Sequence, residues 1–217
     1  MAQPPDPAPA EAEPSDAARA RPGRPSSGAR ERMLDAALEV LKAEGYSGLS
    51  TAKVAARSGQ NKALISYHFG SKQGLVAEVA RTVSTRITEE LLQAIGEPRD
   101  MRGLARGLVD GVAALNARDE GLPRMYFDLA AQAIVDPEVR SIMAEMKAGY
   151  RAVLRRELAR VTDGPRSSAE GEAAAVFMVA CLEGLMLDQL ERGETPELKR
   201  ARAMFVDSVV AGLARRH

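Results

Sequence analysis

Residues 50–72 read STAKVAARSGQNKALISYHFGSK, and this stretch decides the fold of the N-terminal part of the chain. Its residue pattern predicts two short helices joined by a tight turn. The first helix, over residues 51–58, follows a serine, which is a preferred residue type at helix N-caps. Gly59 supplies the backbone freedom that the turn requires. Asn61 then caps a second helix over residues 62–68.

The second helix has two distinct faces. Ile65 and Phe69 lie four residues apart and form an apolar face that we expect to be buried. The opposite face carries cationic, small, hydroxyl and aromatic side chains: Lys62, Ala63, Ser66 and Tyr67. Small residues let a helix approach DNA closely, a cation reaches base edges or phosphates, and hydroxyls bind phosphate oxygens. This composition is typical of a recognition helix in a major groove.

The segment NKALISYHFGSKQGL, residues 61–75, closely resembles the end of the helix-turn-helix in TetR-type transcriptional regulators. The aromatic–His–Phe–Gly–Ser–Lys run is its specific part, and the resemblance covers roughly residues 29–78. Two positions depart from the family pattern. Gln60 stands in the turn where an apolar residue is usual. Leu64 stands where a smaller or polar residue often faces DNA, so it either touches a thymine methyl or tucks inward.

The resemblance implies specific DNA contacts for the predicted recognition helix and its surroundings. Lys62 and Ala63 are expected to face bases, and Tyr67 the boundary between bases and backbone. Thr51, Ser66, His68 and Lys72 are expected to hold phosphates, and Asn61 completes this DNA-binding set.

The charge distribution agrees with a DNA-binding N-terminal part. The formal net charge of the 217-residue chain is zero. Residues 19–75, however, hold ten Lys or Arg against four Asp or Glu, a net of +6. Residues 1–18 carry −4 and residues 76–217 carry −2. A local basic patch suffices for phosphate contact, although a solvated charged helix would explain the same distribution.

Residues 1–28 contain no large apolar side chain beyond Met1, so we expect a disordered arm. Within it, Arg21 and Arg24 stand in the run ArgProGlyArgPro, which resembles the arm that some TetR-type proteins carry. Such an arm can enter a narrow A·T-rich minor groove, or it can be a linker with non-specific attraction for DNA.

Apolar residues recur at helical spacing through the rest of the chain, and no alternating β-branched run appears, so the fold is predicted to be all-α. We expect a three-helix domain over residues 29–75 and a helical effector-binding and dimerisation domain over residues 76–217. The first helix is expected to end at Gly45. The further helices are predicted at residues 72–95, 101–118, 124–135, 137–161, 168–191 and 196–215.

The resemblance also implies a small-molecule effector in the C-terminal domain. Candidate residues for its pocket are the larger flexible and aromatic side chains: Met101, Tyr126, Phe127, Met143, Met146, Tyr150 and Phe177. For any single one of them, ordinary core packing is the simpler interpretation, and the resemblance is what favours a cavity.

A homodimer is implied in the same way, because the last two helices of TetR-type proteins pair with those of a second subunit. The apolar faces of these helices look wider than one packing partner requires. The predicted interface residues are Leu182, Leu185, Phe205, Val206, Val209 and Leu213.

Several classes of protein are not supported by the sequence. His68 and His217 are the only histidines and Cys181 is the only cysteine, so we expect no metal site, cofactor or catalytic centre. We expect no apolar stretch as long as the ~18 residues of a membrane helix, and no signal peptide. A cytoplasmic protein is therefore expected.

Together these observations predict a homodimeric, ligand-responsive transcriptional regulator, a repressor that binds a palindromic operator. Two other classes stay open: an architectural DNA-binding protein without an effector, and an all-helical enzyme.

Overall fold

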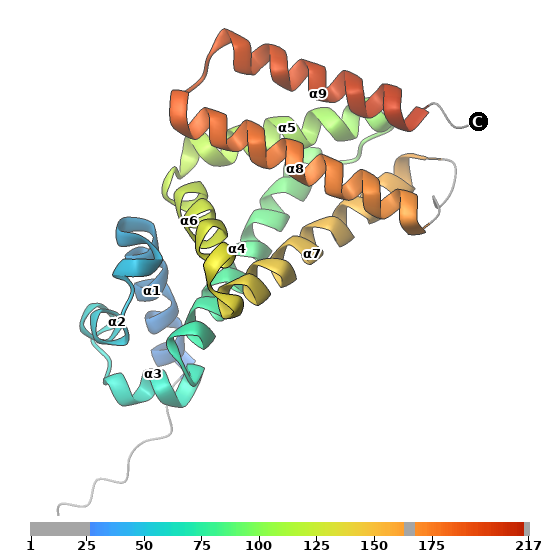
Figure 1. Cartoon of the computed structure of the whole chain (residues 1–217). Coiled ribbons are helices and arrows are strands. Elements are labelled where there is room, and N and C mark those ends of the chain that lie inside the picture. The colour runs from blue at the N-terminus through green and yellow to red at the C-terminus, as the bar shows by residue number, and fades with distance from the viewer. Residues whose placement is uncertain (1–26, 163–167, 215–217) are drawn as a thin grey trace, which may run out of the picture.

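The computed structural model describes residues 27–162 and 168–214, which form nine helices and no strand (Figure 1). Arg21, Arg24 and the rest of residues 1–26 lie outside the described residues, as do residues 163–167 and the side chain of Leu213. The last two residues of the predicted disordered arm, 27 and 28, are instead the first residues of a helix. The helices, in chain order, are α1 (Ser27–Gly48), α2 (Thr51–Ser58), α3 (Lys62–Phe69), α4 (Lys72–Ile95), α5 (Met101–Arg118), α6 (Gly121–Val135), α7 (Pro137–Val161), α8 (Ser168–Arg192) and α9 (Pro196–Ala214). The predicted all-α fold is confirmed.

The helix-turn-helix forms as its capping residues predict. Ser50 Oγ accepts a hydrogen bond from Lys53 N at 3.2 Å and begins α2. Gly59 ends it in the left-handed conformation, with φ 65°. Asn61 Oδ1 then accepts from Ala63 N at 2.9 Å and begins α3. These caps are local, which is why the sequence located both helices closely.

Two helix ends differ from the predicted ones. α1 does not stop at Gly45 but continues to Gly48 across a kink, at which Gly45 has φ 70° and ψ −175°. α6 begins at Gly121, so residues 121–123, predicted as a break, form its first turn. Pro123 is tolerated there because the first N–H groups of a helix have no partner within the helix.

The apolar core does not divide at residue 75. One cluster joins α1, α2, α3 and the first half of α4 to α6 and the first half of α7, from Ala29 to Met146. A second cluster joins α5, the second half of α7, α8 and α9. The proposed domain division at residues 75 and 76 therefore runs through a shared core, and α4 passes from one cluster to the other (Figure 1).

A polar junction also connects the end of α1 to α6. Asp128 accepts a hydrogen bond from the backbone N–H of Tyr46, and Lys42 forms an ion pair with Asp119. Tyr46 also donates from its hydroxyl to Asp136 Oδ2 at 3.2 Å. Burial and the neighbouring Asp136 carboxylate raise the pKa of Tyr46, so it stays a donor. We call these contacts the α1–α6 junction.

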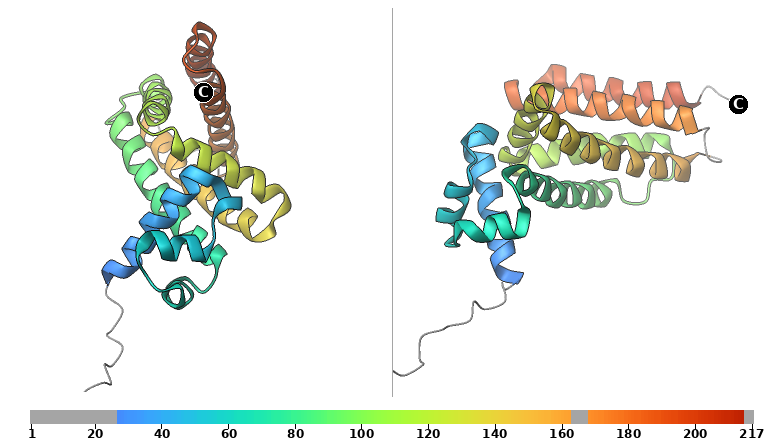
Figure 2. Two further views of the ribbon diagram at one scale, coloured as in Figure 1. Left: turned by 90° about the vertical axis from the view of Figure 1, so that its left-hand side faces the viewer. Right: turned by 60° about the horizontal axis from the view of Figure 1, so that its bottom comes forward.

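Helices α8 and α9 form an antiparallel pair that lies across α5 and α7 at the end of the molecule away from α1–α3 (Figure 2). The composition of α8 contradicts the expectation that no apolar stretch of the chain is as long as a membrane helix. Residues Ala169–Arg192 are long and apolar enough to cross a membrane, with a mean hydropathy of 1.6 over 18 residues, of which 22% are buried. A core helix of a soluble protein is mostly buried, so the exposed apolar surface of α8 requires an explanation.

Candidate nucleic-acid interface and ligand cavity

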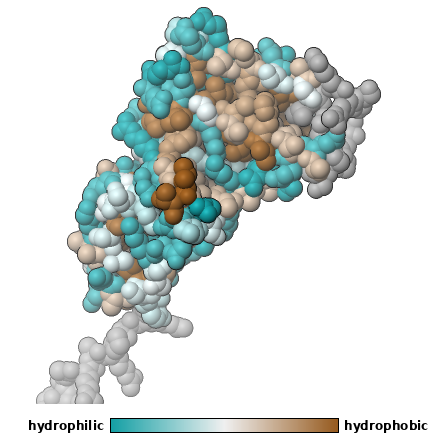
Figure 3. All heavy atoms as spheres, viewed as in Figure 1, coloured by the Kyte–Doolittle hydropathy of each residue, from teal (hydrophilic) through white to brown (hydrophobic). Residues whose placement is uncertain are grey.

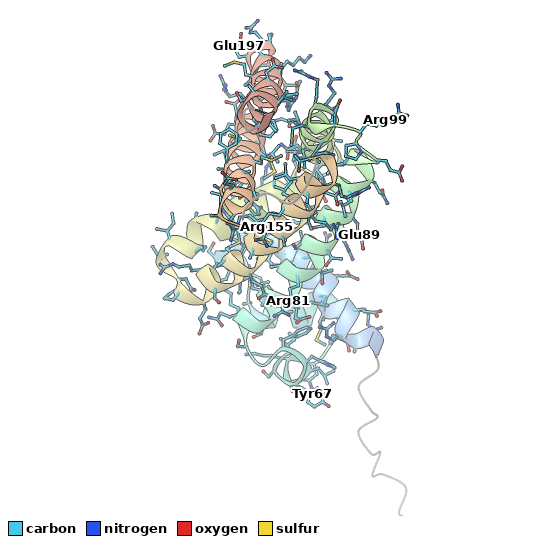
Figure 4. All side chains as sticks on the ribbon, turned by 90° about the vertical axis from the view of Figure 1, so that its right-hand side faces the viewer. Tyr67, Arg81, Glu89, Arg99, Arg155 and Glu197 are labelled. Atoms are coloured by element: carbon cyan, nitrogen blue, oxygen red, sulfur yellow. The ribbon has the colours of Figure 1, made fainter. Side chains whose placement is uncertain are left out.

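Helix α3 presents the predicted face to solvent. Ile65 is 1% exposed and Phe69 8%, and both pack into the first core cluster. The other side of the helix is open, and Tyr67 is 71% exposed at the far end of the molecule (Figure 4). Lys62, Ala63 and Ser66 are exposed as well. The amphipathic arrangement that the sequence predicted for this helix is therefore confirmed.

The two positions that depart from the family pattern take part in the packing of the turn. Leu64 is half-buried and packs against the first core cluster, so it tucks inward. The side-chain amide of Gln60 donates to the carbonyl oxygens of Ser58 and Gly59, at 3.4 and 3.2 Å. A polar residue in this turn thus satisfies backbone acceptors at the end of α2.

Lys72 is placed differently from the prediction. Its Nζ donates to the carbonyl oxygen of Tyr46 at 3.0 Å and lies 4.1 Å from the centre of the Tyr46 ring. The ammonium group therefore connects the start of α4 to the end of α1, and this contact takes the place of the predicted phosphate contact. His68 and Thr51 are half-buried, and His68 packs edge-on against Tyr67 with ring centres 5.1 Å apart.

A cavity of about 110 Å³ lies in the C-terminal part, between α4, α5, α6, α7 and α8. Its wall is formed by Ile87, Thr88, Leu91, Leu92, Ile95, Leu108, Val112, Leu115, Asn116, Leu122, Pro123, Tyr126, Tyr150, Val153, Leu154, Val179, Leu182, Glu183 and Met186. The wall is almost wholly apolar, and this is typical of sites for small apolar molecules.

Only two of the seven predicted pocket residues, Tyr126 and Tyr150, line this cavity. Met143 and Met146 are buried in the first core cluster, and Phe127 packs against it. The other two lie elsewhere: Met101 packs against the second cluster, and Phe177 is 48% exposed on α8.

None of the α4 residues in the cavity wall is among the predicted pocket residues. Ile87, Leu91 and Ile95 continue its apolar stripe at helical spacing beyond the part of α4 that packs on the N-terminal helices. That excess of apolar residues was the available signal. Leu182, predicted to lie in the dimer interface, also lines the cavity.

One corner of the cavity contains an ion pair between Glu183 and Lys147. The hydroxyl of Tyr126 donates to Glu183 Oε1, and Lys147 Nζ lies 3.0 Å from Glu183 Oε2. Burial and the hydrogen bond to Glu183 raise the pKa of Tyr126, so its hydroxyl remains protonated. Burial likewise raises the pKa of Tyr150. Residues 27–162 and 168–214 contain no group of three His, Cys, Asp or Glu side chains that could hold a metal ion.

The exposed apolar surface of α8 and α9 differs from the predicted interface. Phe205, Val206, Val209 and Leu182 are buried in the subunit's own second core cluster, and Leu185 packs against it. The exposed apolar and small residues are a stripe along α8 and one residue on the adjacent α9: Ala173, Val176, Phe177, Ala180, Gly184, Leu187 and Met204. Figure 3 shows apolar surface gathered over α8. We call these residues the α8–α9 stripe.

The comparison with family models agrees with the residues described above. Residues 33–79 match the model described as bacterial regulatory proteins of the TetR family. Residues 101–214, more than half of the chain, match the BetI-type transcriptional repressor C-terminal model. The chain belongs to the TetR family. It is a DNA-binding transcriptional regulator and not an enzyme.

Individual TetR-family proteins resemble the chain over most of its length. The transcriptional regulator BetI 1 of Chromohalobacter salexigens is 22% identical over 86% of this chain and 91% of its own. A crystal structure of a candidate TetR-family regulator from Rhodococcus sp. superposes with a TM-score of 0.72 at 21% identity, covering 86% of this chain and 98% of the other. At that identity the likeness shows the fold.

A further neighbour among the solved structures contains a small molecule. The multidrug-binding protein EbrR, in complex with imidazole, superposes with a TM-score of 0.65 at 25% identity. The match covers 84% of this chain and 90% of EbrR.

The exposed face of α3 gives a direct prediction for this TetR-family protein. Lys62→Ala and Tyr67→Ala should each weaken specific operator binding by about 1–3 kcal/mol, because both side chains project from the face opposite Ile65 and Phe69. Anisotropy titrations at fixed salt measure this change. Lys199→Ala, which removes an exposed lysine of α9, is the control for loss of charge alone. Parental affinity in both α3 variants would show that α3 does not read the DNA.

Proposed function

We propose that the protein is a homodimeric repressor that binds a palindromic operator through α3 and releases it when a small apolar molecule occupies the cavity. A cytoplasmic location belongs to the same proposal. The match to the BetI-type repressor model supports repression, and the imidazole complex of EbrR supports a ligand in the C-terminal part.

The observation that carries this proposal is the course of α4. Its first half, from Leu75 to Val83, is buried in the core cluster that holds α1, α2 and α3. Its second half, from Ile87 to Ile95, forms a wall of the cavity. A molecule that changes the position of the second half must also act on the first, because both belong to one continuous helix.

Helix α6 provides a second connection between the cavity and α1. Leu122, Pro123 and Tyr126 line the cavity. From the same helix and its two ends, Asp128, Asp119 and Asp136 hold the end of α1 in the α1–α6 junction. A ligand releases DNA only if it binds the DNA-free arrangement more tightly than the DNA-bound one. An effector that lowers operator affinity tenfold therefore contributes about 1.4 kcal/mol of coupling, and operator lowers ligand affinity by the same factor.

The α8–α9 stripe supports the homodimer. Exposed apolar residues on two adjacent helices are typical of a protein–protein contact, and a two-fold dimer through this stripe would cover them. This contact also accounts for the apolar surface of α8 without a membrane. Two copies of α3 then read the two halves of a palindrome.

The proposed DNA-contacting residues are Lys62, Ala63, Ser66 and Tyr67, which are exposed on α3, with Asn61 at its N-cap and Thr51 and His68 beside them. Contacts from Arg21 and Arg24 stay a prediction for the arm. Deleting residues 1–25 and measuring the salt dependence of operator binding would test them.

The cavity assignment is tested by filling the cavity. Val179 of α8 faces it, and Val179→Phe should occupy the space without touching α3. We expect unchanged operator affinity, whereas any compound that releases the parent protein should bind at least about tenfold more weakly, because its space is taken. The measurement is operator release in anisotropy titrations, with compounds first selected on the parent protein. Unchanged release in the variant would place the effector site elsewhere.

A further inference from the structure

Asn116 of α5 is the most unusual residue of the cavity wall, because it is polar and only 4% exposed. Its side-chain Nδ2 donates to the backbone oxygen of Met186 and to Gln189 Oε1, both at 3.1 Å. A backbone oxygen can only accept, so these bonds fix which end of the amide is nitrogen. The other end, Oδ1, has no hydrogen-bond partner among the described residues.

Asn116 Oδ1 cannot leave this position by rotation of the side-chain amide without loss of hydrogen bonds. Rotating the amide would place Oδ1 against the oxygen of Met186 and lose both donor bonds. Gln189 is itself held, because Arg202 Nη2 donates to its Oε1 at 2.8 Å, and Arg202 Nη1 lies 2.7 Å from Glu194 Oε1. A buried acceptor without a partner costs free energy, which a suitable donor would recover.

The same wall does not favour a cation. Among the described residues that line the cavity, Glu183 alone carries a carboxylate, and its two oxygens are engaged by Tyr126 and Lys147. Lys147 Nζ also lies 5.8 Å from the centre of the Tyr126 ring. A second cation would thus meet a carboxylate whose charge is balanced and an aromatic ring that already has a cation beside it.

We propose that the effector of the cavity is an uncharged, mainly apolar molecule that donates one hydrogen bond, from a hydroxyl or N–H group, to Asn116 Oδ1. This inference rests on the proposed function and specifies the ligand of that site. Oδ1 is not exposed to solvent, so the ligand reaches it by displacing the atoms that cover it. The flexible side chain of Met186 lies in the same part of the wall.

Three single-ring probes that suit a cavity of this size separate the relevant properties. Toluene is neutral without a donor, phenol is neutral with one, and benzylammonium is a cation with donors. Their dissociation constants are measured by NMR titration on the full-length protein and on Asn116→Leu. The ratio of phenol to toluene affinity, compared between the two proteins, cancels the cost of removing phenol from water.

We expect phenol to bind the parent protein, and the ratio to shift about tenfold toward toluene in Asn116→Leu. Toluene should still bind the variant, which shows that the cavity persists. An unchanged ratio would overturn the role of Asn116, and tight binding of benzylammonium would overturn the uncharged class. If Asn116→Leu does not fold, the parent protein alone decides. Binding of toluene without binding of phenol overturns the inference, and binding of phenol supports it. If neither neutral probe binds the parent protein, the cavity is not the effector site and the proposed function itself fails in that part.

Discussion

Phe177→Glu is expected to convert the proposed dimer into a soluble, folded monomer that has lost operator affinity by roughly a hundredfold or more. Phe177 belongs to the α8–α9 stripe and is 48% exposed in the single subunit, so a charge there costs the subunit little. In a two-fold dimer the same charge would be buried without a partner. A monomer binds one half of the palindrome and loses the gain from linked binding of the second half.

Phe205→Glu is the informative contrast. Phe205 is 5% exposed and packs in the subunit's own core, so this variant should lose about 3–5 kcal/mol of stability and unfold or precipitate. Sedimentation velocity and circular dichroism on both variants distinguish these outcomes. A native-like dimer from Phe177→Glu would move the interface away from the α8–α9 stripe.

Phe177 and Phe205 also show that the sequence does not reveal which side of α8 and α9 faces the subunit's own core. Both α8 and α9 carry apolar residues on more than one side, and periodicity alone does not say which side meets the subunit's own core. The prediction that these helices have surplus apolar surface agrees with the exposed α8–α9 stripe, whereas four of the residues assigned to that surface, Leu182, Phe205, Val206 and Val209, are buried in the subunit's own core. The side that α8 turns inward depends on α5 and α7, and the side that α9 turns inward depends on α5, and these partners lie far along the chain.

Helix ends were predictable where the signal is local. Ser71, Asp100 and Asp136 each accept a hydrogen bond from a backbone N–H two or three residues ahead and begin α4, α5 and α7. Such caps can be read from a few neighbouring residues.

Contacts between distant segments were not predictable in this way. Lys72 donates a hydrogen bond to the carbonyl oxygen of Tyr46, 26 residues earlier, and no local sequence pattern predicts that contact. The cavity is the same kind of feature, because five helices form its wall.

Gly74, in the first turn of α4, gives the second large expected effect. A Cβ at this position would lie 2.0 Å from the backbone oxygen of Phe69, which ends the recognition helix α3. The obstacle is backbone and not a flexible side chain, so α3 or α4 would have to move. The backbone N–H of Gly74 also donates to Ser71 Oγ at 2.9 Å, which fixes this turn further.

Gly74→Ala should therefore destabilise the protein by about 3 kcal/mol or more and abolish specific operator binding, because relief of the clash displaces α3 from its core contacts at Ile65 and Phe69. The matched control is Gly149→Ala in α7, where an added Cβ meets nothing within 4 Å. That exchange should stabilise the protein by about 0.5–1 kcal/mol through helix propensity. Urea unfolding at one protein concentration, with an operator titration, measures both variants. Equal stability and operator affinity of the two would mean that the close approach of α3 to α4 does not hold the recognition helix in place.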